Sequence, residues 1–204
     1  MATPCLLVID MQQAFVTHAE HWGPGGERNN PGAEERVREL LAAFRSRGMP
    51  VVHARHDSVE EGSPLWPGLP SHAFIAGCEP PDDESEPVFG KAVNSAFIGT
   101  DLEAHLRANF LSDLVICGIT SIHCVNTTVR MAGNLGFSVR VPEDATATFA
   151  RRNVMRPSEV IPAQVVHETA LSVLHGEFCQ VTTTAEIIEA LGGGSSRGGV
   201  FLMV

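Results

Sequence analysis

Residues 115–149 read VICGITSIHCVNTTVRMAGNLGFSVRVPEDATATF, and this stretch carries a strand, a helix and a second strand in succession. The apolar run Leu114 to Cys117 is typical of a buried strand, and Ser138 to Val141 is typical of another. Between them, Cys124 to Leu135 has helical period, and Gly136 lies where a helix end needs a left-handed residue. The stretch therefore predicts strands and helices that alternate in a layered α/β arrangement.

Short apolar, β-branched runs continue to alternate with segments of helical period on both sides of this stretch. The other predicted strands are Cys5 to Ile9, Pro50 to Ala54 and Cys179 to Val181, and the other predicted helices are Ala33 to Arg47, Thr100 to Asn109, Pro162 to Leu174 and Thr183 to Leu191. This alternation predicts an α/β fold in which helices cover both faces of a mostly parallel sheet.

Local residue chemistry marks several helix ends. Thr100 with Glu103, and Thr183 with Glu186, have the spacing of a capping box at a helix start. Gly48 stands where a helix end needs a residue with positive φ. These signals support the positions of three of the predicted helices.

The composition favours one domain without a surface for nucleic acid or membrane. The chain has 204 residues, of which 44% are hydrophobic, and this suffices for a sizeable core. Because 24 Asp and Glu outnumber 14 Lys and Arg, giving a net charge of −10, we expect neither nucleic acid nor anionic membrane as a partner.

No run of about 20 apolar residues could span a bilayer, and the N-terminal residues lack a basic leader. We therefore expect a soluble cytoplasmic protein.

The two ends of the chain differ in composition. We expect one domain over residues 1–191, followed over residues 192–204 by a Gly/Ser-rich linker and an apolar tail. That tail either docks on a neighbouring surface or is disordered. A further stretch, from Asp57 to Pro87, is rich in Pro, Gly and acids and is too long for an ordinary connection, so it predicts a functional excursion or lid.

Three polar residues lie at the ends of predicted strands, where open parallel sheets bind their ligands. Asp10 follows the run LLVI, Lys91 follows PVFG, and Cys124 begins a helix a few residues past the strand LVIC. The unpaired N–H groups of a helix start stabilise a thiolate and lower its pKa, and they can also bind an oxyanion. The pattern is consistent with a nucleophilic site in which Asp10 exchanges protons and Lys91 gives electrostatic support.

Each of these residues also has an ordinary structural explanation. A lone cysteine is more often a small buried hydrophobe, and this explanation suits Cys5, Cys117 and Cys179 in their apolar strand runs. Asp10 could form a turn at a strand end, and Lys91 could be a solvated loop charge. The five cysteines contain no C-x-x-C pair, which argues against a disulfide framework and a cysteine zinc cage.

Three separated motifs resemble the isochorismatase-like cysteine hydrolases, the group that includes nicotinamidases and N-carbamoylsarcosine amidase. The motifs are LLVIDMQQAF at 6–15, GKAVNSAFIGTDL at 90–102 and the stretch at 115–149 quoted above. The phrases VNSAFIGTDLE, MAGNLGF and LHGEF look most like a subgroup that includes streptothricin hydrolase. The resemblance implies a Rossmann-like three-layer α/β/α sandwich with a six-stranded, mostly parallel sheet, and a homodimer or homotetramer.

The resemblance also implies roles for individual residues. Asp10, Lys91 and Cys124 map onto the catalytic triad of the family, in which the thiolate attacks a carbonyl carbon and water later releases the acyl group. A cis peptide bond is expected between Ile119 and Thr120, and the N–H groups of Thr120 and Cys124 are the expected oxyanion hole. True isochorismatases lack the nucleophilic cysteine, so its presence favours cleavage of a C–N bond.

Departures from relatives bear on metal binding. Metal-binding nicotinamidases place an Asp-x-His unit after the second strand, whereas this chain has HARHDS at residues 53–58. His53, His56, Asp57 and His72 could still form a metal site, although such a cluster more often makes ordinary hydrogen bonds. We therefore expect no metal and no other cofactor.

Other residues have roles that are less specific. Phe15 and Trp66 are candidates for the pocket wall, with plain core packing as the alternative. His123 either faces the pocket or has a structural role. We expect Arg130, six residues past the cysteine, to form an ion pair with Asp144.

The leading hypothesis is a cysteine-dependent hydrolase that cleaves an amide, lactam or ureido bond of a small-molecule substrate through an acyl-thioester. A metal-assisted hydrolase that uses the histidine cluster is a second hypothesis. A catalytically silent binding protein is the third, and the presence of all three triad residues speaks against it. Specificity depends on loops whose shape the sequence does not give.

Overall fold

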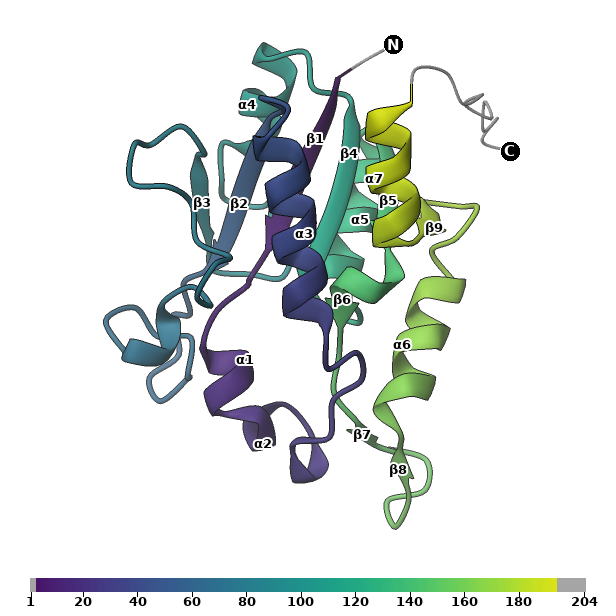
Figure 1. Ribbon diagram of the computed structural model, residues 1–204. Helices are drawn as coiled ribbons and strands as arrows, with labels where there is room; N and C mark the ends of the chain where they lie inside the picture. Colours follow the sequence, from purple (N-terminus) through teal and green to yellow (C-terminus); the bar gives the residue numbers. More distant parts are fainter. Residues whose placement is uncertain (1–2, 194–204) are drawn as a thin grey trace.

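A computed structural model describes residues 3–193 of the chain, and its centre is a sheet covered by helices on both faces (Figure 1). The strands of the sheet are β1 (Pro4–Ile9), β2 (Val51–His56), β3 (Val88–Lys91), β4 (Asp113–Ile119), β5 (Ser138–Pro142), β6 (Thr146–Ala147) and β9 (Gln180–Thr182). Six of them lie in the order β3-β2-β1-β4-β5-β9, and β6 adds a seventh by pairing with β4. Every pairing in this sheet is parallel. The expected three-layer sandwich with a parallel sheet is confirmed.

The helices form the two outer layers. They are α1 (Ala14–Thr17), α2 (Ala19–Trp22), α3 (Ala33–Arg45), α4 (Leu102–Ala108), α5 (Cys124–Asn134), α6 (Ala163–Ser172) and α7 (Thr184–Gly192), with short 3₁₀ turns at Pro24–Gly26, Pro70–His72 and Glu143–Ala145. Helices α3 and α7 pack side by side on one face of the sheet (Figure 1). Helix α5 packs on β4 and β5 from the other face.

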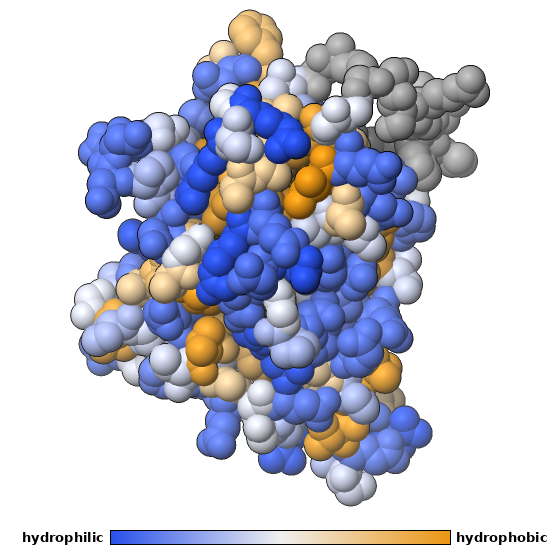
Figure 2. All heavy atoms as spheres, viewed as in Figure 1, coloured by the Kyte–Doolittle hydropathy of each residue, from blue (hydrophilic) through white to orange (hydrophobic). Residues whose placement is uncertain are grey.

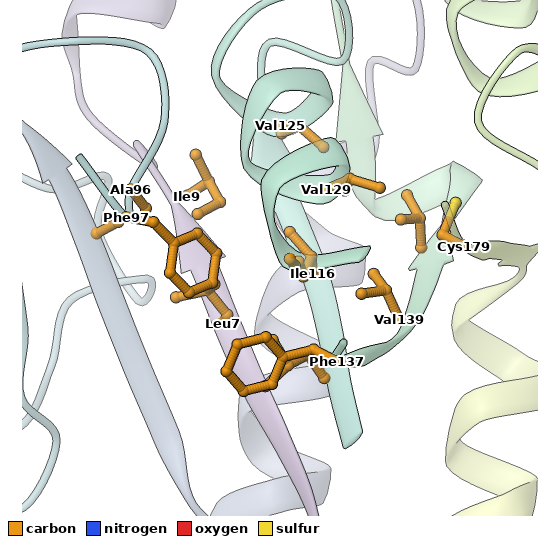
Figure 3. Close-up of a cluster of buried hydrophobic side chains, with 14 of the residues drawn as sticks. Leu7, Ile9, Ala96, Phe97, Ile116, Val125, Val129, Phe137, Val139 and Cys179 are labelled. Atoms are coloured by element: carbon orange, nitrogen blue, oxygen red, sulfur yellow. The ribbon is translucent and has the colours of Figure 1, made fainter. Parts of the chain in front are cut away.

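Strand alternation divides the core into two apolar layers. In β1, Cys5, Leu7 and Ile9 join the cluster under α4, α5 and α6, whereas Leu6 and Val8 join the cluster under α3. Figure 3 shows the first layer, with side chains of β1, β4, β5 and α5 meeting around Ile116 and Val129. Because both faces are covered, these central strands have nearly continuous apolar sequences.

The surface over α3 is mostly hydrophilic, with hydrophobic residues in small separate groups (Figure 2). This agrees with the pattern of α3, whose Val37, Leu40, Leu41 and Phe44 are buried while its charged side chains face outward. Within residues 3–193, no helix has both the length and the apolar character needed to cross a membrane. The five cysteines are free, buried thiols, and burial was expected for Cys5, Cys117 and Cys179.

Helix ends test the predicted capping signals. Gly48 and Gly136 have φ values of 62° and 84°, which confirms their left-handed conformation. Thr183 and Glu186 form the expected capping box at the start of α7. The capping box at Thr100 is wrong, because α4 begins at Leu102 and the Thr100 hydroxyl instead donates to the carbonyl of Ala96, 2.5 Å away.

Several short elements were not predicted. These are β3, β6, the two helices α1 and α2, and an antiparallel hairpin of β7 (Arg151–Arg152) and β8 (Val160–Ile161). Each spans four residues or fewer, so no periodicity could develop in the sequence. Residues 194–204, which hold most of the predicted linker and the apolar tail, lie outside the described residues.

Candidate active site

The three residues proposed as a triad meet at the edge of the sheet formed by the carboxyl ends of its strands. Asp10 follows β1, Lys91 is the last residue of β3, and Cys124 is the first residue of α5. Lys91 Nζ lies 2.8 Å from Asp10 Oδ2. An oxygen of Asp10 and the Sγ of Cys124 lie within 4.8 Å of each other. The site is therefore assembled from segments far apart in the sequence, as an open parallel sheet allows.

Asp10 is fully buried and turns sharply out of its strand. Its φ of 50° lies in the left-handed region, which few residues other than glycine adopt. Its N–H donates to the carbonyl of Ala54, 2.9 Å away, so β2 fixes the backbone at this point. Oδ2 accepts a hydrogen bond from Lys91, whereas the buried Oδ1 has no partner among residues 3–193. One carboxylate oxygen is thus available to accept a proton.

The Lys91 ammonium is buried and uses all three of its donors. It donates to Asp10 Oδ2 at 2.8 Å, to His56 Nδ1 at 3.1 Å and to the carbonyl of Val93 at 3.3 Å. Burial alone would lower the pKa of Lys91, but the Asp10 carboxylate and the Cys124 sulfur together outweigh burial, and the pKa is raised above its ordinary value. Lys91 is therefore a fixed positive charge beside the thiol.

The loop between β4 and α5 brings the cysteine to these two residues. Gly118 has a φ of 123°, and a Cβ there would overlap the carbonyl oxygen of Ile9, so only glycine permits β4 to approach β1 this closely. The expected cis peptide bond between Ile119 and Thr120 is present. The N–H groups of Thr120 and Cys124 donate to no other described residue. Both remain available for a ligand oxygen.

Burial raises the pKa of the Cys124 thiol, and the Asp10 carboxylate raises it further, while Lys91 opposes them. This direction is opposite to the lowering expected from the helix start alone. The prediction failed because it considered the helix dipole without the cost of placing a thiolate in a buried site. Because its pKa is raised, the sulfur carries its proton at pH 7, and the Asp10 carboxylate is an acceptor close enough to take it.

A cavity of about 290 Å³ lies over the thiol. Its lining residues are Phe15, His21, Trp22, His56, Ser58, Val59, Glu60, Ser63, Leu65, Ala92, Val93, Asn94, Thr120, His123 and Cys124. Phe15 and His123 thus lie on the cavity wall, and the stretch after β2 contributes residues from Ser58 to Leu65. The hollow is large enough for a small molecule.

Trp66 is not among the lining residues of this cavity, which contradicts its predicted place on the wall. The neighbouring Leu65 faces the cavity instead. The indole on the wall is that of Trp22, whose ring centroid lies 4.5 Å from that of Phe15 and whose Nε1 donates to the carbonyl of Ala14. Trp22 was missed because α2 is a four-residue helix without any pattern in the sequence.

The predicted histidine cluster does not come together as a metal site. His53 pairs with Glu86 and His72 pairs with Asp57, each at 2.7 Å, so these residues make ordinary hydrogen bonds. His56 pairs with neither carboxylate, and its Nδ1 lies 3.1 Å from Lys91 Nζ.

A different group, Asp10, His56 and Cys124, has the spacing of metal ligands within the described part of the chain. However, the Lys91 ammonium already donates to both Asp10 and His56, and its charge would repel a second cation. The residues present therefore do not fit a metal ion.

Arg130 does not pair with Asp144, so that prediction is wrong. The guanidinium lies 4.7 Å from the centroid of the Phe178 ring, and Nε donates to Asn126. Asp144 instead accepts hydrogen bonds from the N–H and hydroxyl of Thr184 at the start of α7. Both residues therefore fix the packing of helices and lie outside the cavity.

Comparisons with known proteins give the family and the fold of the chain. A family model described as the isochorismatase domain matches residues 4–186. The uncharacterized isochorismatase family protein YrdC of Bacillus subtilis is 38% identical over 90% of this chain and 93% of that protein. Streptothricin hydrolase of Streptomyces noursei is 35% identical over 89% of this chain and 63% of that enzyme. A solved structure of an isochorismatase-family hydrolase from Chromobacterium violaceum has 47% identity and a TM-score of 0.86, covering 93% of this chain and 94% of that one.

Proposed function

Because the chain belongs to the isochorismatase family, we propose that it hydrolyses a C–N bond of a small molecule with Cys124 as the nucleophile. The observation that carries the proposal is the convergence of Asp10, Lys91 and Cys124 beneath one cavity. Streptothricin hydrolase, a relative by sequence, is named for the hydrolysis of streptothricin. We extend the substrate class to amides, lactams and ureido compounds.

The acylation half of the reaction begins with transfer of the thiol proton to Asp10. The thiolate then attacks the carbonyl carbon, the new C–S bond forms, and the carbonyl electrons move to oxygen. The free N–H groups of Thr120 and Cys124 would stabilise that oxyanion. When the intermediate collapses, the C–N bond breaks, the leaving nitrogen takes the proton from Asp10, and a thioester remains on Cys124.

The deacylation half uses water and the same carboxylate. Asp10 takes a proton from the attacking water while the water oxygen bonds to the thioester carbon. Collapse of the second intermediate breaks the C–S bond, and the thiolate recovers its proton from Asp10. Throughout, Lys91 remains charged and offsets the negative charge, which alternates between Asp10 and the sulfur. The sum is amide plus water giving acid plus amine.

A substrate panel and an adduct measurement test the proposal. Wild type and Cys124→Ala are compared on primary amides, lactams and N-carbamoyl amino acids, and mass spectrometry follows the mass of the enzyme under turnover. We expect hydrolysis and an acyl adduct on Cys124 in wild type, and neither in the variant. Cys179→Ala is the matched control, because that thiol is also buried but lies outside the cavity. Turnover that survives in Cys124→Ala would rule out the proposed nucleophile.

A further inference from the structure

His56 stands beside the triad, on the strand between those of Asp10 and Lys91. It ends β2 and is in register with Lys91 at the end of β3. The buried Gln12 side chain fixes its backbone, since Gln12 Oε1 accepts from the His56 N–H at 2.9 Å and Nε2 donates to its carbonyl at 3.1 Å. His56 lines the cavity together with Cys124, and its Nδ1 lies 4.0 Å from the sulfur. Its ring is therefore held at a definite place next to the reacting atom.

Lys91 determines which nitrogen of His56 carries the proton. An ammonium group has donors and no acceptor, so the 3.1 Å contact requires His56 Nδ1 to accept. Burial, assisted by Lys91, lowers the pKa of His56, and the ring is therefore neutral at pH 7. A neutral ring that accepts at Nδ1 has its hydrogen on Nε2.

The Nε2–H group has no hydrogen-bond partner among residues 3–193. It is also not among the unpartnered polar atoms that are fully enclosed by protein, and it belongs to a ring that lines the cavity over Cys124. An unpartnered donor on a ring that lines a cavity is available to an acceptor atom of a ligand. Such a donor discriminates strongly, since a substrate that cannot satisfy it leaves it buried and unpaired.

We propose that His56 donates its Nε2–H hydrogen bond to an acceptor atom on the acyl part of the substrate, beside the scissile carbonyl. This inference rests on the proposed function. In the tetrahedral intermediate the carbon carries the Cys124 sulfur, an oxygen, the leaving nitrogen and the acyl substituent. The N–H groups of Thr120 and Cys124 donate to the oxygen, and Asp10 protonates the leaving nitrogen. The acyl substituent is therefore the part of the intermediate that remains for His56 to contact. The substrates are then C–N compounds that bear an oxygen or nitrogen acceptor next to the scissile carbonyl.

Two isosteric ester probes and two variants test this assignment. The probes are p-nitrophenyl methoxyacetate and p-nitrophenyl butyrate, whose acyl chains differ by one ether oxygen in place of a methylene. His56→Gln keeps a donor near the position of Nε2 but loses the acceptor for Lys91, whereas His56→Asn keeps the acceptor near Nδ1 and loses the donor. The measurement is the rate of acylation, followed as the burst of p-nitrophenolate, with kcat/KM for each pair of enzyme and probe.

We expect His56→Asn to reduce the preference for the ether over the butyrate by about tenfold, which corresponds to one neutral hydrogen bond. His56→Gln should retain most of that preference. Comparing ratios within each enzyme removes the intrinsic difference in reactivity between the two esters. His18→Asn, at an exposed histidine, is the control and should leave both rates unchanged.

Two outcomes would overturn the inference while leaving the nucleophile intact. If both variants keep the wild-type preference, His56 does not contact the substrate. If the variants are acylated more slowly by both probes to the same extent, and the loss is largest in His56→Gln, then His56 acts only by positioning Lys91. A different outcome would contradict the proposed function itself. If wild type releases no burst of p-nitrophenolate and does not differ from Cys124→Ala, then Cys124 is not the nucleophile, and the inference fails with the proposed function.

Discussion

Cys117 and Cys124 lie on either side of the Ile119–Thr120 peptide bond and are nearly equal in burial, with exposures of 0% and 7%. Burial raises the pKa of both thiols. Cys117 lies in β4 among the apolar side chains under α3, and within residues 3–193 no carboxylate or cation shifts its pKa. Cys124 faces Lys91, Asp10 and a cavity. What separates an inert thiol from a candidate nucleophile here is therefore the supply of charged partners and an opening for substrate.

The largest expected effect comes from removing the proton acceptor that Cys124 has and Cys117 lacks. Asp10→Asn is nearly isosteric, so we expect the fold to remain while hydrolysis of an amide substrate falls by about 10³-fold, the usual contribution of a positioned general acid–base. Steady-state kcat and the thermal unfolding midpoint are the measurements. Turnover within about tenfold of wild type would show that another group moves the proton.

Loss of the charge on Lys91 should cost stability as well as activity. Lys91→Met leaves the Asp10 carboxylate buried without its cation, and we expect the free energy of unfolding at pH 7 to fall by about 3 kcal/mol or more. The double variant Asp10→Asn/Lys91→Met buries no charge and should recover part of that loss. Denaturant titration measures both. A Lys91→Met protein as stable as wild type would mean that water reaches Asp10 and that the pair is not truly buried.

The sequence predicted the long helices and strands around the two cysteines better than it predicted the side-chain contacts of the site. The long apolar runs of β1 and β4, and the regular period of α3 and α5, predicted those elements and brought Asp10 and Cys124 to one edge of the sheet. Sequence reasoning also noted Lys91 at a strand end. It could not predict Trp22, because short helices carry no periodicity, or the partner of Arg130, because that depends on Phe178 in a distant segment. The direction of the His56 ring depends on Lys91 in another strand, so its role too required the structure.

Serine substitutions should separate the two thiols by their surroundings. Cys117→Ser places a hydroxyl in an apolar layer, and we expect a loss of about 2 kcal/mol in the free energy of unfolding. Cys124→Ser places the hydroxyl near Asp10 and Asn94, where it can form hydrogen bonds, so the loss should be smaller. Equal losses in the two variants would indicate that the Cys124 site is as apolar as the core. Denaturant midpoints, measured side by side, decide between these outcomes.

The smallest expected effect concerns the charge of the Cys124 thiol in the free enzyme, followed by alkylation with iodoacetamide. Only the thiolate reacts, and the pKa of Cys124 is raised, so the rate in wild type should continue to rise as pH increases above the ordinary thiol value. Asp10→Asn removes one cause of the raised pKa and leaves Lys91 unopposed. We therefore expect the alkylation curve to move to lower pH, with a rate at pH 8 that is severalfold higher than in wild type.

In this result alkylation and turnover would change in opposite directions, because Asp10→Asn would lose hydrolysis and gain thiol reactivity. Mass spectrometry of the alkylated peptide assigns the site, and Cys117, which is fully buried, is the internal control that should stay unlabelled. Slower alkylation of Asp10→Asn would mean that the carboxylate matters as a proton acceptor more than as a charge. Fast alkylation of wild type near pH 7 would mean that the helix start and Lys91 outweigh burial, and that the resting thiol of this site is ionised after all.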